Sequence, residues 1–453
     1  MTETSHAPQL THDVLRAAVE GPTAAIRLVT KLLPAGGPLD KIFPPTYAGG
    51  VYAIETRKID GRDVRCVHLD SVQSQANRLE QALLRAYEDA HLRFPVMVVD
   101  FSGTDVHDVG RITTLDAPHR IADAIFRDSL LNGVPFRESL EGKAFERASV
   151  RHATALFDLC PTALVFGTWD STGSKGGRGN KFARAVVSEI VAIDVAFGLK
   201  TSSRIDPLGI EVCDIFEASD GTWTTDEGIA KKDPKTGSPI KYGRNRKTRG
   251  KPSAIIHGNV TPGFATYTDN VDVLDPLKRH LMEALKHDSP GRDMSARDVN
   301  IREGQVAAGG VTMAYALQTT VLSLPALRRL RFPVDGGGAG PEREHAARTV
   351  LAALALASVA FQSAQGYDLR SRCALVPADN SAAFELVTTG TDLARYSLPP
   401  DQAARILDQA ANEARRVGLP WRTDEIKLVP SKALVQLVVT SRANAAEGES
   451  EGV

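Results

Sequence analysis

The strongest constraint on the fold is a hairpin followed at once by a helix and a short buried strand. Asp60-Gly61 is a strong signal for a type I′ turn, so strands are expected at about 50–59 and 64–69. The next residues repeat apolar side chains every three or four positions, which predicts one buried helical stripe: Val72, Ala76, Leu79, Leu83 and Tyr87. Asp70 and Gln73 are expected to cap this helix.

Further elements follow from periodicity and turn residues. Helices are expected near 117–131, 148–159, 271–287 and 400–417, in LSLPALRRL, and fully buried in EREHAARTVLAALALASVAFQ. Strands are expected in FPVMVVDFSG, TALVFGTW, AVVSEIVAID, GGVTMAYALQ, LRSRCALVP and FELVTTG, and as a closing pair in IKLVPSKALVQLVVTS. This mixture fits an α+β sheet with helices on one face and large excursions. A ferredoxin-like or RNA-recognition-type sheet is one candidate among several that periodicity leaves open.

The chain is expected to divide into five parts. They are a helical N-terminal extension (1–45), the first part of the sheet (46–216), a basic insertion (217–262), the second part with helical insertions (263–443) and a disordered tail (444–453).

Composition bounds the class of protein. Hydrophobic residues make up 42% and charged residues 24%, which is typical of a soluble globular chain. No apolar run reaches the roughly 18 residues of a membrane helix, and no signal peptide is recognisable. The four cysteines lie far apart without a CxxC pair, which argues against zinc ribbons and disulfide frameworks. A cytoplasmic protein without a metal is therefore expected.

The first candidate for nucleic-acid contact is the polar side of the helix that begins near Ser71. Ser74, Asn77 and Arg78 lie opposite the apolar stripe, close to a helix N-terminus whose free N–H groups suit phosphate. The alternative is a solvated face of an amphipathic helix, which is common.

The second candidate is the glycine-rich segment GTWDSTGSKGGRGNKFAR. Glycines let a backbone approach phosphate closely. Its cations are Lys175, Arg178, Lys181 and Arg184. Trp169 could stack on a base. The segment has neither Walker A nor GxGxxG spacing, so no nucleotide cofactor is expected. A flexible exposed connection is the competing interpretation.

Two further segments carry cations. KTSSRIDPLGI places Arg204 beside hydroxyls, a weak signal that an ordinary capped turn explains as well. Between residues 231 and 251 there are nine Lys or Arg and one acid, whereas the whole chain has a net charge of −1. Such a limb favours nucleic acid over a solvated loop. Its cations are Lys231, Lys232, Lys235, Lys241, Arg244, Arg246, Lys247, Arg249 and Lys251.

Two other functions stay open. Asp100, Asp105, His107 and Asp108 follow a predicted strand and could hold a metal for ribonuclease chemistry. The chain could also be a protein-interaction scaffold whose basic limb contacts an acidic partner.

Four motifs in a fixed order resemble a known family. PPTYAGG, LDSVQSQANRLE, FGTWDSTGSKGGRGNKFARAVVSEIV and KTSSRIDPLGI are similar to the backbone subunit, of the RAMP superfamily, of type I-G (formerly I-U) CRISPR effector complexes. The resemblance covers about 44–210 and is looser towards the C-terminus.

The resemblance implies a fold and a function. The fold would be a modified RNA-recognition sheet, called the palm, with helical insertions and a basic thumb hairpin, for which 217–262 is the candidate. Copies of the subunit would polymerise along CRISPR RNA and present it to target DNA without catalysis. Other partners would be a large subunit, a RAMP cap and processing subunit, and a helicase-nuclease recruited later. Aromatic residues are only 6% of the chain, so backbone contacts are expected rather than base stacking on the sheet.

Overall fold

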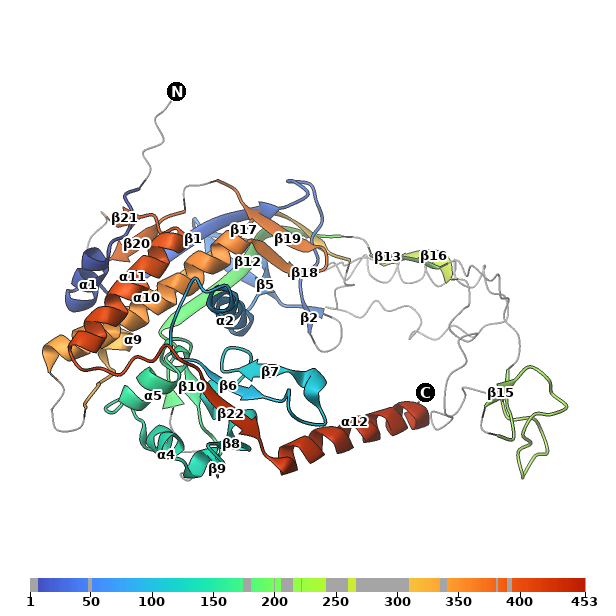
Figure 1. Cartoon of the computed structure of the whole chain (residues 1–453). Coiled ribbons are helices and arrows are strands. Elements are labelled where there is room, and N and C mark those ends of the chain that lie inside the picture. The colour runs from blue at the N-terminus through green and yellow to red at the C-terminus, as the bar shows by residue number, and fades with distance from the viewer. Residues whose placement is uncertain are drawn as a thin grey trace. The chain divides into compact units, whose positions relative to one another are not determined.

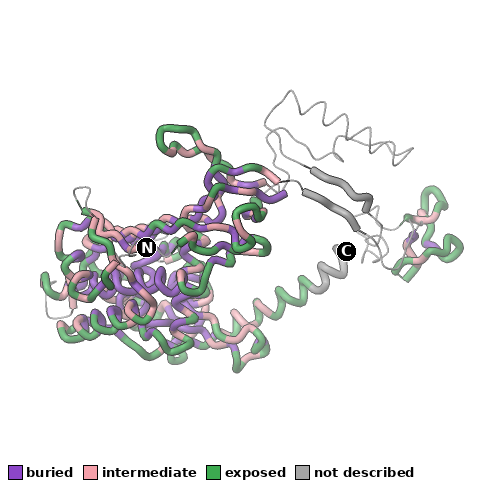
Figure 2. The backbone as a smooth tube through the Cα atoms, turned by 90° about the horizontal axis from the view of Figure 1, so that it is seen from above, coloured by how far each residue is buried: buried purple, intermediate pink, exposed green. Residues whose placement is uncertain are grey.

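The computed structural model describes residues 7–47, 51–173, 181–198, 200–204, 215–220, 222–241, 260–265, 309–334, 340–379, 382–388 and 393–452 (Figure 1). The chain forms two compact units. Unit 1 comprises residues 1–197 and 310–434, and unit 2 comprises residues 198–309 and 435–453. Buried residues fill the interior of unit 1, whereas α12 (Lys432–Gly452) is exposed along most of its described length (Figure 2).

A large antiparallel sheet is the core of unit 1. Its main path runs β18-β19-β1-β17-β12-β5-β4. The strands are β18 (Tyr367–Arg370), β19 (Cys373–Pro377), β1 (Ala25–Pro34), β17 (Val311–Ser323), β12 (Val186–Phe197), β5 (Arg62–Asp70) and β4 (Ile54–Ile59). β20 (Phe384–Val387) pairs with β1, and β21 (Ala394–Tyr396) pairs with β20.

Within this sheet lies a ferredoxin-like β-α-β-β-α-β unit. In chain order it is β1, α2 (Val72–Glu88), β12, β17, α10 (Pro341–Gln365) and β19. The four strands lie side by side in the order fourth, first, third, second, and every neighbouring pair is antiparallel. This is the split β-α-β topology that the sequence left as one candidate, so the predicted α+β class is confirmed.

The first strand of this unit was missing from the sequence prediction. Residues 1–45 were expected to be a helical extension, but within the described residues 7–45 the one helix is α1 (His12–Glu20), and β1 pairs with β17 from Ala25 to Leu32. Ile26, Leu28, Thr30 and Leu32 are buried in alternation, which is the period of a strand. The predicted boundary at residue 46 therefore cuts off one strand of the sheet.

The predicted hairpin and the helix after it are confirmed. β4 and β5 pair around Asp60-Gly61, and both residues have the positive φ that a type I′ turn needs (49° and 76°). α2 begins after Ser71, whose hydroxyl accepts from the Ser74 N–H, so Ser71 replaces the predicted Asp70 and Gln73 as the cap.

α2 and α10 cover the same face of the sheet (Figure 1). A buried polar network joins them to it. Gln75 Oε1 of α2 accepts from Gln318 Nε2 of β17 at 3.0 Å, and Gln318 Nε2 also donates to Gln362 Oε1 of α10 at 3.2 Å. Ser188 and Tyr367 complete the network. Even-numbered positions of β17 therefore face the helices, and odd-numbered ones face the other side.

α11 (Pro400–Arg416) packs on α10, and α9 (Leu324–Arg328) follows β17. α10 is the one helix in the described part of the chain that is long and apolar enough to cross a membrane, contrary to the expectation from apolar runs. Its most apolar window is 94% buried inside the protein, as for the core helix of a soluble protein.

A second sheet of unit 1 has the order β7-β6-β22-β8-β9. The strands are β6 (Met97–Asp100), β7 (Arg111–Thr113), β8 (Ser129–Leu131), β9 (Val134–Pro135) and β22 (Ile426–Pro430). The short helices of this region are η1 (His107–Val109), η2 (Arg120–Ala122), α3 (Ala124–Arg127), η3 (Phe136–Glu138), α4 (Leu140–Arg147), α5 (Thr154–Leu159) and α6 (Thr162–Val165).

Three predicted elements differ here. The helix near 117–131 is broken into η2, α3 and β8, because Arg120 has a left-handed φ of 54°. TALVFGTW forms α6 before a short strand, because its fully buried apolar run fits either structure. The closing strand pair is β22 followed by α12, which continues through 444–452 in place of the expected disorder.

Apart from the part of α12 that belongs to unit 2, the described elements of this unit are short. β13 (Lys200–Arg204) pairs with β16 (Val260–Ala265), and β14 (Phe216–Glu217) pairs with β15 (Trp223–Thr224). In unit 1, β2 (Thr46–Tyr47) pairs with β3 (Val51–Tyr52). The helix predicted near 271–287 lies outside the described residues.

Candidate nucleic-acid interface

The polar side of α2 is divided between solvent and core. Asn77 is exposed, as predicted, but Ser74 and Arg78 turn towards Asp70, which is completely buried. Ser74 Oγ donates to Asp70 Oδ1 at 2.7 Å, and Arg78 Nε donates to Asp70 Oδ2 at 2.9 Å. A buried carboxylate needs such partners, so these two side chains hold the fold together.

Arg78 also holds the edge hairpin of the central sheet. Its guanidinium donates to the carbonyl oxygens of Asp368 and Leu369 in β18. Arg370, at the end of β18, donates to the Leu69 carbonyl at 2.8 Å. The start of α2 thus fixes the β18–β19 hairpin, a role that its sequence did not reveal.

The glycine-rich segment is closed at its base as a hairpin. β10 (Thr168–Trp169) pairs with β11 (Lys181–Phe182). Trp169 is 52% exposed, and the Lys181 ammonium lies 5.8 Å from the centre of its ring. Lys175 and Arg178 lie outside the described residues. The stem presents an aromatic ring and a cation side by side, a combination suited to a base and its phosphate.

A buried ion pair anchors this stem. Arg120 Nε and Nη2 donate to the two carboxylate oxygens of Glu80, each at 2.6 Å, and Arg120 Nη1 donates to the Gly167 carbonyl at 2.7 Å. Gly167 has a φ of +83°, and a Cβ there would lie 3.0 Å from the Phe182 carbonyl oxygen. Glycine is therefore needed where the two stem strands approach each other.

Arg184 and Arg137 make two further contacts that hold the stem. Arg184 Nε donates to the Phe166 carbonyl at 3.2 Å, so this predicted phosphate contact is directed partly inwards. Burial and the neighbouring charge of Arg120 lower the pKa of Arg184. Asp170 is buried and accepts from Arg137 at 2.6 and 3.0 Å. Although burial opposes it, this pairing lowers the pKa of Asp170.

Glu80 is the buried carboxylate that pairs with Arg120. Burial raises its pKa to about 7, outweighing the opposing effect of Arg120. Forty residues separate Glu80 from Arg120, so no spacing in the sequence indicated the pair.

The predicted basic sites of unit 2 are only partly described. Arg204 ends β13. Lys231, Lys232 and Lys241 are exposed, and Lys231 lies 3.8 Å from Glu217. Backbone hydrogen bonds hold the chain together here, and the Ile240 N–H donates to the Lys231 carbonyl at 2.9 Å. Arg244, Arg246, Lys247, Arg249 and Lys251 lie outside the described residues.

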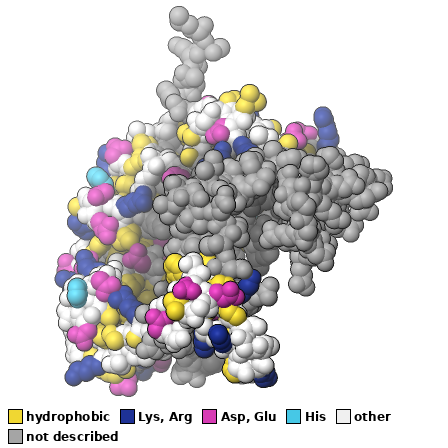
Figure 3. All heavy atoms as spheres, turned by 90° about the vertical axis from the view of Figure 1, so that its right-hand side faces the viewer, with side chains coloured by type: hydrophobic (Ala, Val, Ile, Leu, Met, Phe, Trp, Pro, Cys, Tyr) yellow, Lys and Arg dark blue, Asp and Glu magenta, His cyan; other side chains and the backbone are white. Residues whose placement is uncertain are grey.

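Charges are mixed on one face of the described part. On the face shown in Figure 3, Lys and Arg side chains are interspersed with Asp and Glu. A nucleic-acid site must therefore be sought in local groups of cations rather than in one broad basic face.

The metal-site alternative has no support in the structure. No group of three or more His, Cys, Asp or Glu that could hold a metal ion occurs among the described residues. Asp105, His107 and Asp108 are exposed, and Asp100 accepts from the Ser102 N–H at 2.9 Å. Hydrogen bonds from Ser102 lower the pKa of Asp100.

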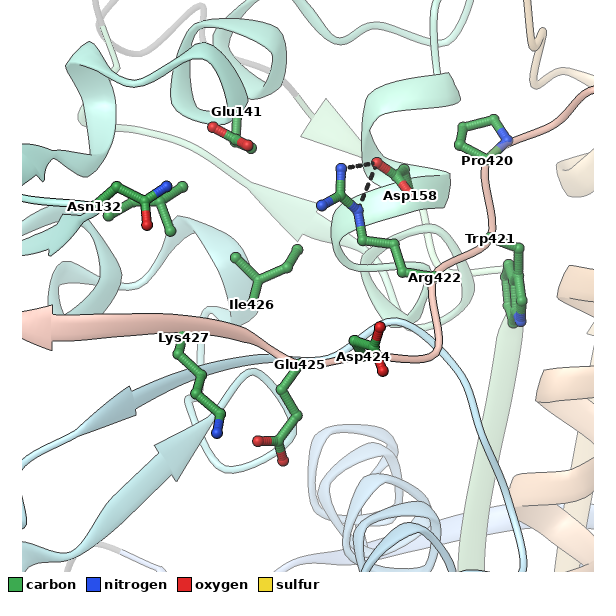
Figure 4. A pocket seen from close by; sticks show the side chains of 11 residues that line it. Asn132, Glu141, Asp158, Pro420, Trp421, Arg422, Asp424, Glu425, Ile426 and Lys427 are labelled. Atoms are coloured by element: carbon green, nitrogen blue, oxygen red, sulfur yellow. Dashed lines mark hydrogen bonds and ion pairs between the residues drawn. The ribbon is translucent and has the colours of Figure 1, made fainter.

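A cavity of about 730 Å³ opens beside β22 and α5 (Figure 4). Four acids line it, namely Glu141, Asp158, Asp424 and Glu425. Arg422 Nε and Nη2 both donate to Asp158 Oδ2, at 2.8 and 2.5 Å, so its cation is already paired. This acidic cavity is unsuited to a polyanion.

Part of the chain matches a protein family. Residues 26–197 are similar to the family described as CRISPR-associated protein GSU0053. The matched segment runs from the second residue of β1 to the last residue of β12, and it includes α2 and the glycine-rich hairpin. No curated protein matches the chain. This part of the chain is therefore similar to a CRISPR-associated family.

Proposed function

We propose that this protein is a non-catalytic backbone subunit that binds CRISPR RNA in a type I-G effector complex. Several copies polymerise along the guide in the cytoplasm and present it for pairing with target DNA. Its protein partners are the large subunit, the RAMP cap and processing subunit, and a helicase-nuclease recruited later.

The observation that carries the proposal is where the family match falls. It covers the first three elements of the ferredoxin-like unit together with the hairpin that displays Trp169 and Lys181. Cations on the loops of such a sheet would contact the sugar–phosphate backbone, and phosphate contacts carry no sequence information. A guide-binding subunit needs this independence of sequence, because it must accept any spacer.

RNA binding by the purified protein tests the proposal. Affinity for a labelled single-stranded RNA is measured over a range of salt, with a scrambled RNA as the control. We expect log K to fall linearly with log salt, at about 0.7 per neutralised phosphate, and scrambling to change little. Binding that ignores salt, or that discriminates strongly between sequences of equal length, would refute the proposal. Cleavage of RNA that stops with chelator would favour the nuclease.

A further inference from the structure

Cations on the central sheet fall into two classes. Some are neutralised by carboxylates. Arg27 pairs with Glu385 at 2.6 Å, and Arg57 pairs with Glu189 at 2.9 Å. Others rest on aromatic rings, at the end of the sheet where β1 finishes and β17 begins.

Lys31 and Tyr315 form the first pair of the second class. The Lys31 ammonium lies 4.6 Å from the centre of the Tyr315 ring. Tyr315 is at an odd-numbered position of β17, and Lys31 of β1 is paired with Leu317, also odd-numbered. Both side chains therefore lie on the face of the sheet opposite α2 and α10.

Arg372 and Phe43 form the second pair. The Arg372 guanidinium lies 4.7 Å from the centre of the Phe43 ring, and the Lys41 ammonium lies 5.5 Å from it. Arg372 occupies the turn between β18 and β19 with a left-handed φ of 57°, and its carbonyl accepts from the Phe43 N–H at 2.9 Å. The turn is thus held in place by backbone contacts.

The two pairs lie at the two ends of β19, the strand next to the edge strand β18. The Lys31 carbonyl accepts from the Ala378 N–H, just beyond the end of β19, whereas Arg372 immediately precedes β19. At about 3.3 Å per residue, roughly 20 Å separates these points. An extended polyanion that followed β19 would meet both cations.

A ring holds a cation without cancelling its charge. The attraction comes from the quadrupole of the ring, which carries no net charge, so the ammonium and guanidinium donors stay available for an anion. Lys31 and Arg372 are both exposed, and neither forms an ion pair with a carboxylate in the described part of the chain. Their side chains are also ordered in advance, which reduces the entropy lost on binding.

We propose that Lys31 and Arg372, supported by Tyr315 and Phe43, form a phosphate-binding edge that contacts the sugar–phosphate backbone of a single-stranded nucleic acid. The proposal rests on the proposed RNA-binding function and adds a site separate from the glycine-rich hairpin and the basic segment. The rings act by positioning cations, so the site reads no sequence.

The test compares two double variants of the full chain. Lys31→Ala with Arg372→Ala removes the edge. Lys58→Ala with Arg405→Ala removes the same charge from two exposed cations that are paired with Asp63 and Asp401. The probe is a labelled single-stranded RNA of mixed sequence, titrated over a range of salt.

Loss of two phosphate contacts should reduce the slope of log K against log salt by about 1.4 and weaken binding about tenfold near physiological salt. The control should keep the wild-type slope. Lys31→Arg in place of Lys31→Ala should recover the part of the affinity that Lys31 contributes.

Equal slopes for the edge variant and the control would overturn the phosphate-binding edge while leaving the proposed function standing. A wild-type protein that binds no RNA would instead refute the proposed function. An edge variant that binds RNA normally but fails to associate with the other subunits would also overturn the inference, because the edge would then be a protein contact.

Discussion

Glu80 and Arg120 meet in the core through two parallel hydrogen bonds, each 2.6 Å long, and the third nitrogen of Arg120 holds the Gly167 carbonyl. The pair connects α2 to the base of the glycine-rich hairpin. Arg120 adopts a left-handed backbone to reach this position, which costs about 1–2 kcal/mol for a residue other than glycine. The ion pair and the carbonyl contact offset that cost.

Arg120→Ala should destabilise the protein by about 3–5 kcal/mol, because it leaves the buried Glu80 without its cation. Urea unfolding followed by circular dichroism measures the loss. Arg405→Ala, on the surface of α11, is the control and should change stability by less than about 0.5 kcal/mol. A loss for Arg120→Ala no larger than that of the control would show that the pair contributes nothing to the fold.

The stability of the protein should depend on the protonation of Glu80. Burial raises its pKa from 4.5 to about 7, so the folded state binds more protons than the unfolded state between these values. The contribution of Glu80 to stability is therefore fully present below about pH 4.5 and declines as the pH rises towards 7. Thermal unfolding across this range should show a steeper decline, or a smaller rise, for the wild type than for Glu80→Gln. Parallel curves would contradict the raised pKa.

Arg78→Ala should lower stability rather than only weaken RNA binding. Its guanidinium pairs with the buried Asp70 and holds two carbonyl groups of β18, so its loss should cost about 1–3 kcal/mol. Asn77→Ala, one residue earlier on the exposed side of α2, should leave the melting temperature unchanged. Equal melting temperatures for both variants would return Arg78 to the set of exposed phosphate contacts first predicted.

The sequence predicted the fold where local rules decide. The Asp60-Gly61 turn, the stripe of α2 and the apolar composition of α10 each point to one structure. β1 was missed because turn residues and proline after it resemble a joint, and only pairing with β17 and β19 makes it a central strand. Tertiary partners, and not local propensity, determine such a strand.

The candidate site was harder to predict, because the sequence alone does not distinguish a polar side chain that turns inwards from one that stays exposed. Arg78 and Arg184 resemble solvated cations in the sequence, yet both donate to groups within the protein. Lys31 and Arg372 lie far apart in the chain, and only the sheet places each against its ring. Which cation stays available therefore depends on whether a carboxylate or a ring faces it.

Trp169→Ala should weaken RNA binding by about 1–3 kcal/mol without changing the melting temperature, because the exposed ring can stack on a base. Lys181→Ala should add a reduction of about 0.7 in the salt slope. Leu140→Ala, which removes another exposed apolar side chain outside the candidate interface, is the control, and fluorescence anisotropy with labelled RNA is the measurement. An equal loss in Trp169→Ala and the control would show that the stem makes no specific contact.

The basic segment 231–251 offers the last prediction. It carries nine Lys or Arg and one acid, and its described backbone is held by bonds such as Lys231 N to the Glu217 carbonyl at 2.7 Å. Replacing the nine cations by Gln keeps that backbone, whereas deletion would remove it.

If the segment is the thumb, it touches nucleic acid held partly by its own subunit and partly by the next one. The Gln variant should then impair filament formation on a long guide more than binding of one protomer to a short oligonucleotide, since each weakened junction is repeated along the filament. Sedimentation on the long guide and anisotropy on the short one give the comparison. Filaments that form normally at physiological salt would show that these cations are a solvated loop, and another segment must then join neighbouring subunits.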